Sequence, residues 1–158
     1  ANNYGNLVMR SMSIKLNPNQ QVPQACIENL DQSLVKLING LYFTVKECIS
    51  NFDIQKGLIE INNVITQTNK YVNDNKPWVL AKQNETEQLG NVLYLILESV
   101  RITGILLSPV MPDTINKLLD DLGIKQEDRT TNKLYVGGRG LGESFGSNRT
   151  ILFQKVTK

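Results

Sequence analysis

The chain has 158 residues, of which 41% are hydrophobic, and its 17 basic and 15 acidic residues give a formal net charge of +2. A chain of this length suits one globular domain that buries about two-thirds of its unfolded surface. The small net charge excludes a polycation, so any nucleic-acid site has to be a local patch. The absence of histidine excludes imidazole-based acid–base catalysis, Ser–His–Asp and Cys–His nucleophiles, and zinc sites that use imidazole.

Hydrophobic residues recur at helical spacing in five segments, which predicts an all-α bundle of five helices. The segments are Leu7 to Leu16, Leu30 to Phe52, Ile54 to Val72, residues 84–107 and Pro112 to Leu122. The segment at 84–107 is apolar around most of its circumference, so we expect it to be the central helix. It contains no run of about 18 uninterrupted apolar residues, because Glu98 stops the longest one, and we expect no membrane span.

Helix boundaries are marked by residues that cap or break helices. Asp53 is the predicted N-cap of the third helix, and Asn84 with Glu87 forms a capping signature for the fourth. Pro77 is predicted to break the third helix, and Gly123 to close the fifth.

The first residues and the two cysteines lead to two further expectations. The N-terminal residues include neither an initiator Met nor a signal pattern, so we expect a domain of a longer protein. Cys26 and Cys48 fall inside helical patterns, and we expect both to be buried and reduced.

The composition changes after Gly123, which suggests a bundle at residues 1–124 and a C-terminal tail at 125–158. The tail is predicted to fold back on the bundle or toward a catalytic domain outside this sequence. Its glycines, between Gly137 and Gly146, match neither nucleotide-binding spacing, so we interpret them as a flexible connection. The run Ile151 to Val156 suits a strand or a strap, and the Asp120-Asp121 pair suits the surface.

Two groups of polar and aromatic residues are candidates for binding RNA. Asn6 and Arg10 are four residues apart on one helix face and could grip the edge of an unstacked base, although spacing alone favours a solvated polar face. Trp78, the only tryptophan, follows Pro77 at a helix break and is flanked by Lys70, Lys76 and Lys82. A rigid aromatic ring beside lysines can stack a base, although a lone Trp is more often a core or interface residue.

Tyr4-Gly-Asn-Leu-Val-Met-Arg10 and the stretch from Asn62 to Lys82 resemble two motifs of the C-terminal anticodon-binding domain of class I methionyl-tRNA synthetases. The resemblance implies that Asn6 and Arg10 face the anticodon and that Trp78 stacks on an anticodon base. Related synthetases for leucine, isoleucine, valine and cysteine share other stretches, so the choice of methionine rests on these three residues together. Residues 2–124 carry the resemblance in order.

The resemblance implies that the parent enzyme is a ligase that activates methionine with ATP and attaches it to tRNA bearing a CAU anticodon. The ATP site, and any zinc site, belong to a catalytic domain that is absent here, so we expect no cofactor and no catalytic residue in this chain. In the tail, Leu152 to Val156 is similar to the family's Leu-Phe-Pro-Arg-Ile ending, with Gln154 in the place of proline.

Two alternatives stay open at this point. One is the matching domain of another class I synthetase, and the other is a helical protein-interaction module in which Trp78 anchors a partner protein. We expect a cytoplasmic protein, with the mitochondrial or another organelle matrix as the alternative.

Overall fold

The computed structural model describes residues 2–146 and, within them, six α-helices with three short 3-10 helices. The α-helices are α1 (Asn2–Ser11), α2 (Gln32–Ser50), α3 (Ile54–Asn75), α4 (Pro77–Lys82), α5 (Thr86–Leu107) and α6 (Pro112–Asp121). The 3-10 helices are Ile27–Asn29, Gln126–Asp128 and Thr131–Lys133. The all-α class and all five expected helices are confirmed, and α4 is a sixth, short helix that follows the predicted break at Pro77.

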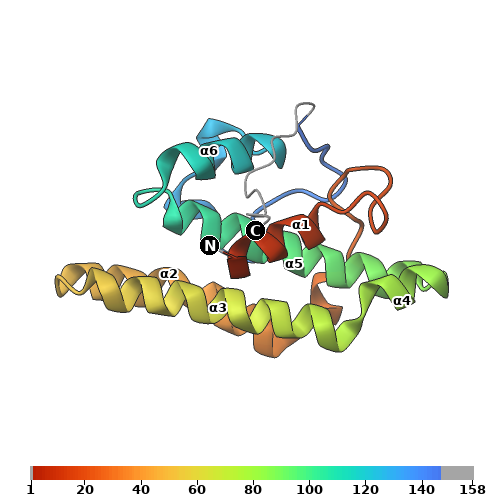
Figure 1. Ribbon diagram of the computed structural model, residues 1–158, viewed down its shortest axis with the longest axis horizontal. Coiled ribbons are helices and arrows are strands. Elements are labelled where there is room, and N and C mark those ends of the chain that lie inside the picture. The colour runs from red at the N-terminus through yellow and green to blue at the C-terminus, as the bar shows by residue number, and fades with distance from the viewer. Residues whose placement is uncertain (1, 147–158) are drawn as a thin grey trace, which may run out of the picture.

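The helices pack around α5, as the sequence predicted for its central segment. In Figure 1, α2 and α3 form a long antiparallel hairpin, α1 and α5 lie over it, and α6 lies beyond α5. α5 is buried on every side from Val92 to Ile105 and contacts α1, α2, α3, α4 and α6. By length and composition α5 could cross a membrane, but 89% of its apolar stretch is buried inside the bundle, which accounts for its hydrophobic surface.

Helix capping explains where α3 begins. The Asp53 carboxylate accepts a hydrogen bond from the Lys56 N–H at 3.0 Å, which confirms the predicted N-cap. The capping signature at Asn84 was wrong. Asn84 has φ +54° in the tight turn after α4, and Glu85 is the N-cap of α5 without a side-chain hydrogen bond.

Three further expectations were wrong, two because a helix ends earlier than its hydrophobic pattern and one because the residue lies outside a helix. α1 ends at Ser11, since the chain turns at residues 13–16 and leaves Ile14 63% exposed. Phe52 sits in the turn between α2 and α3 with φ +57° and is 95% exposed. Cys26 precedes the first 3-10 helix and is exposed, whereas Cys48 is buried as expected, and both cysteines are free.

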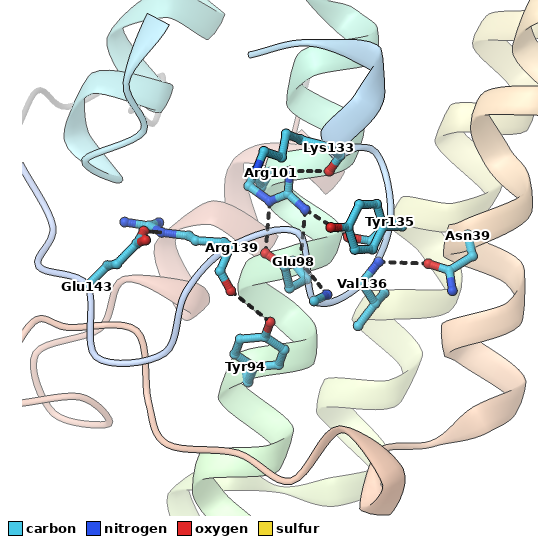
Figure 2. Close-up of polar contacts among 10 residues, drawn as sticks. Asn39, Tyr94, Glu98, Arg101, Lys133, Tyr135, Val136, Arg139 and Glu143 are labelled. Atoms are coloured by element: carbon cyan, nitrogen blue, oxygen red, sulfur yellow. Dashed lines mark hydrogen bonds and ion pairs between the residues drawn. The ribbon is translucent and has the colours of Figure 1, made fainter. Parts of the chain in front are cut away.

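The glycine-rich segment is docked on the bundle, so its interpretation as a flexible connection was wrong. Figure 2 shows its anchor, a buried ion pair in which the Arg101 guanidinium donates to both oxygens of Glu98 at 2.8 Å. Arg101 also donates to the carbonyl of Lys133 at 2.6 Å, and Glu98 accepts from the Gly137 N–H at 3.0 Å.

The end of α6 is covered by the same segment, which corrects the surface assignment of Asp121. The Gly146 N–H donates to the Asp121 carbonyl at 2.8 Å, and Asp121 is 3% exposed, whereas Asp120 is exposed as expected. Gly123 turns the chain out of α6 at φ +74°, as its position predicted. The run from Ile151 to Val156 lies outside the described residues.

Candidate nucleic-acid interface

A seam of amide side chains joins α1 to α3. The Asn69 amide donates to the side-chain oxygen of Asn3 at 2.7 Å, and the Asn3 amide donates to the Thr66 hydroxyl at 3.0 Å. Further along the seam, Arg10 Nη1 donates to Asn73 Oδ1 at 3.0 Å. The seam therefore holds α1 parallel to the C-terminal half of α3 and places the Arg10 guanidinium beside the last turn of α3.

Asn6 points away from the packed side of α1. Leu7 and Val8 are buried in the core, which turns Asn6 to the surface. Asn6 is exposed, and its side chain has no partner among the described residues. Its amide is therefore free to donate and accept at once.

The step from α3 to α4 depends on the backbone of Lys76. This residue is both the C-cap of α3 and the N-cap of α4, with φ 46° and ψ 65° in the left-handed region. Few residues other than glycine adopt this conformation. The Lys76 N–H closes α3 on the Val72 carbonyl at 3.0 Å, and Pro77 starts α4 as its first residue.

Trp78 is set on the outer side of this step. Pro77 and Leu80 are buried and hold α4 against the bundle, whereas Trp78 between them is 43% exposed. The core interpretation of Trp78 is therefore excluded. What remains is a large aromatic surface that can stack on a base or bind another molecule.

The basic side chains near this step carry unpaired charge. Lys70, Lys76 and Lys82 are exposed, and none of them forms an ion pair within residues 2–146. Their positive charge is therefore available to an anionic partner, while the ion pairs of the described chain lie in α5, in α6 and in the docked tail.

The seam residues Asn3, Thr66, Asn69 and Asn73 were missed from the sequence. Their signal is the spacing of three and four residues from 66 to 73, which puts polar groups on one face of α3. That spacing does not reveal that α1 packs there, so the partner of Arg10 could not be named. Among the described residues, no group of three His, Cys, Asp or Glu side chains could hold a metal ion.

A family model described as the anticodon binding domain of methionyl tRNA ligase matches residues 22–158. The chain belongs to this family. The matched part includes α3, α4 and Trp78, whereas Asn6 and Arg10 precede it.

Relatives and solved structures agree with the family. The methionine--tRNA ligase of Caldanaerobacter subterraneus is 35% identical over 140 residues, which cover 87% of this chain and 22% of that protein. The human mitochondrial methionine--tRNA ligase is 30% identical over 160 residues, covering 90% of this chain and 27% of that protein.

The methionyl-tRNA synthetase of Mycobacterium tuberculosis, solved with bound methionyl-adenylate, has a TM-score of 0.85 and 30% identity, covering 96% of this chain and 31% of that one. The chain thus spans between about a fifth and a third of the length of the proteins it matches.

Proposed function

We propose that this chain is the part of a methionyl-tRNA ligase that binds the CAU anticodon of methionine tRNA. The observation that carries the proposal is the exposed Trp78 ring, which lies at the same helix step as three unpaired lysines. Single-stranded RNA is recognised by stacking of splayed bases on aromatic rings and by hydrogen bonds to their edges. Membership of the family supports the anticodon as the segment that is bound.

Asn6 and Arg10 read the base edges in this proposal. The Asn6 amide can pair with a base edge as donor and acceptor together. Arg10 is held by Asn73 through one nitrogen, which orients the rest of its planar guanidinium for a base or a phosphate. Both residues lie on α1, so one rigid helix presents them together.

Lys76 and Lys82 bind the phosphates on either side of the stacked base. They lie at the two ends of α4, which also carries Trp78. Contacts of lysine to phosphates add affinity that depends on salt and carry no information about sequence.

The parent ligase would attach methionine to tRNA in a catalytic domain that this chain does not contain. ATP, and zinc where the enzyme uses it, would bind in that domain, and this chain would hold no cofactor and no catalytic residue. Residues 1–124 would form the anticodon-binding unit, and 125–158 a C-terminal tail that folds back on the bundle or toward that catalytic domain. We place the protein in the cytoplasm, with an organelle matrix as the alternative, since two relatives are mitochondrial.

Filter binding of the 158-residue chain with methionine tRNA, at one fixed salt concentration, tests the proposal. A methionine tRNA with a changed anticodon and tRNAs for leucine, isoleucine, valine and cysteine serve as competitors. The proposal requires methionine tRNA to bind best and its anticodon variant to compete poorly. Preference for another tRNA would assign the chain to that synthetase, and no tRNA binding would favour the protein-interaction module.

A further inference from the structure

A cavity of about 380 Å³ lies where the docked tail meets α5 and the end of α6. Arg101, Lys125, Lys133 and Arg139 line it, together with the acidic residues Asp128 and Glu143. Figure 2 shows Arg101, Lys133, Arg139 and Glu143 around this part of the tail. A water molecule in the liquid takes up roughly 30 Å³, so the cavity has room for a small anion and several waters.

Arg139 is a buried cation of this cavity whose hydrogen bonds are incomplete. Its Nε donates to Glu143 at 3.1 Å and its Nη2 donates to the Leu122 carbonyl. The guanidinium also lies over the Phe145 ring, 5.9 Å from the centroid, but its Nη1 has no hydrogen-bond partner among the described residues. Arg139 is only 7% exposed, and burial lowers the pKa of its guanidinium, which means that its charge is poorly solvated there. A buried cation with a free donor is stabilised by an added anion.

The other charges around the cavity leave its balance positive. Arg101 is neutralised by Glu98, and Glu143 faces Arg139. Lys125 and Lys133 form no ion pair in residues 2–146, and Asp128 is the remaining acidic residue in the lining. Two lysines and the free nitrogen of Arg139 therefore face one uncompensated carboxylate.

We propose that this cavity binds a phosphoryl oxyanion, with Arg139, Lys125 and Lys133 as its cationic partners. The free Nη1 of Arg139 can donate to a phosphate oxygen, and the two lysines add point charges. The site is separate from the proposed anticodon interface, since none of Asn6, Arg10 or Trp78 lines the cavity. The oxyanion is either free or part of an RNA backbone.

Thermal melting of the 158-residue chain in sodium phosphate, against sodium chloride at the same ionic strength, tests the site. At phosphate concentrations about ten times Kd, the melting midpoint should rise by roughly 3–6 °C. A double variant, Lys125→Gln with Lys133→Gln, should lose most of that rise, because both side chains line the cavity and neither forms a hydrogen bond or ion pair within residues 2–146. The matched control, Lys56→Gln with Lys117→Gln at exposed positions, should keep it.

Equal midpoints in phosphate and chloride would overturn the proposal, as would an undiminished shift in the Lys125/Lys133 variant. The source of the oxyanion follows from a tRNA titration of the same two variants. Weaker tRNA binding by the Lys125/Lys133 variant than by the control would assign the site to an RNA phosphodiester, and equal binding would assign it to a free oxyanion. Failure of the anticodon proposal would leave the phosphate shift unchanged, so the two claims are tested separately.

Discussion

Trp78 is the residue whose environment most strongly separates a binding role from a structural one. Its ring is 43% exposed, while its neighbours Pro77 and Leu80 are buried and fix the helix that carries it. A side chain placed in this way contributes less to folding than a fully buried aromatic residue. Its remaining surface is available to a ligand that offers a flat face.

Replacing Trp78 should therefore change binding more than stability. Trp78→Ala should weaken tRNA binding by about 1–3 kcal/mol, roughly 5- to 150-fold, as for other base–aromatic stacks. Its cost in unfolding free energy should stay below the roughly 3–5 kcal/mol of a buried Trp. Trp78→Phe keeps an aromatic face and should retain part of the affinity. Circular dichroism melts beside tRNA titrations give both quantities, and a large loss of stability with unchanged affinity would refute the stacking role.

Arg10 and Lys82 should differ in the kind of affinity that they provide. Arg10→Ala should reduce the preference for the correct anticodon, because a contact to a base edge discriminates between sequences. Lys82→Ala should weaken the binding of all tRNAs about equally. It should also reduce the salt dependence of binding, because a phosphate contact releases counterions. Titrations of cognate and anticodon-variant tRNA at several salt concentrations compare the two. If Arg10→Ala weakens the binding of both tRNAs equally, Arg10 contacts the RNA backbone instead.

Spacing and residue type brought Asn6, Arg10 and Trp78 forward as candidates, and the resemblance to the anticodon-binding domain gave them their proposed roles. The sequence was not sufficient to name the partner of Arg10 or the backbone of Lys76. Asn73 becomes that partner because α1 packs along α3, and Lys76 adopts φ 46° where α3 gives way to α4. Both features depend on contacts that no sequence window contains.

At the scale of elements, α1 is held on α5 by a close contact between Tyr4 and Gly104. The Tyr4 hydroxyl donates to the Val100 carbonyl at 2.9 Å, and a Cβ added to Gly104 would lie 2.8 Å from the hydroxyl oxygen. Tyr4 is 5% exposed and has little room to move. The missing side chain at Gly104 is therefore what lets the two helices approach.

A pair of glycine substitutions tests this contact. Gly104→Ala should lower the unfolding free energy by about 1–3 kcal/mol, because the added methyl group overpacks the interface between α1 and α5. Gly40→Ala, in a helix where an added Cβ meets nothing within 4 Å, should instead raise it by up to about 1 kcal/mol. Urea melts measure both values. Equal effects of the two substitutions would show that α1 does not depend on the Tyr4 contact.

Hydrophobic periodicity predicted which helices exist better than where they end. Asp53 capped α3 as expected because its side chain and the backbone it binds are three residues apart. Asn84 did not cap α5, since the turn after α4 puts it at φ +54°. Phe52 continued the apolar spacing of α2 but fell in the turn, where nothing covers it. Boundaries of this kind depend on how the chain leaves one helix to reach the next.

At the scale of the whole molecule, residues 125–146 complete the core through buried polar groups. Glu98 and Arg101 interrupt the apolar pattern of α5, and the structure explains them as anchors for the backbone around Lys133 and Gly137. The sequence showed the glycines and charges of the tail but not their partners on α5, because those partners are more than thirty residues away.

The buried tyrosines Tyr4 and Tyr94 and the partly buried Tyr71 should make the fold sensitive to alkali. Burial raises the pKa of Tyr71 to about 12 and raises the pKa values of Tyr4 and Tyr94 as well. The folded chain therefore holds these protons when the unfolded chain, with a tyrosine pKa near 10, has lost them. The stabilisation that these groups add to the free energy of unfolding is fully present below about pH 10. It is lost as the pH rises through the folded pKa.

Urea melts between about pH 9 and about pH 11 measure that loss. Tyr71→Phe removes one titrating group, so its unfolding free energy should fall less steeply above about pH 10, by up to roughly 1.4 kcal/mol per pH unit. Tyr135→Phe, at a side chain that is 48% exposed, is the matched control. An unchanged slope for Tyr71→Phe would contradict the burial of this phenol.

The most direct measurement of the proposed function uses the fluorescence of Trp78, which is the only tryptophan in the chain. Titration of the 158-residue chain with the anticodon stem-loop of methionine tRNA should quench this fluorescence and reach saturation, because a base stacks on the ring. A stem-loop with a changed anticodon should produce little quenching at the same concentrations. Equal quenching by both stem-loops, or binding that leaves the Trp78 signal unchanged, would contradict anticodon recognition at this site.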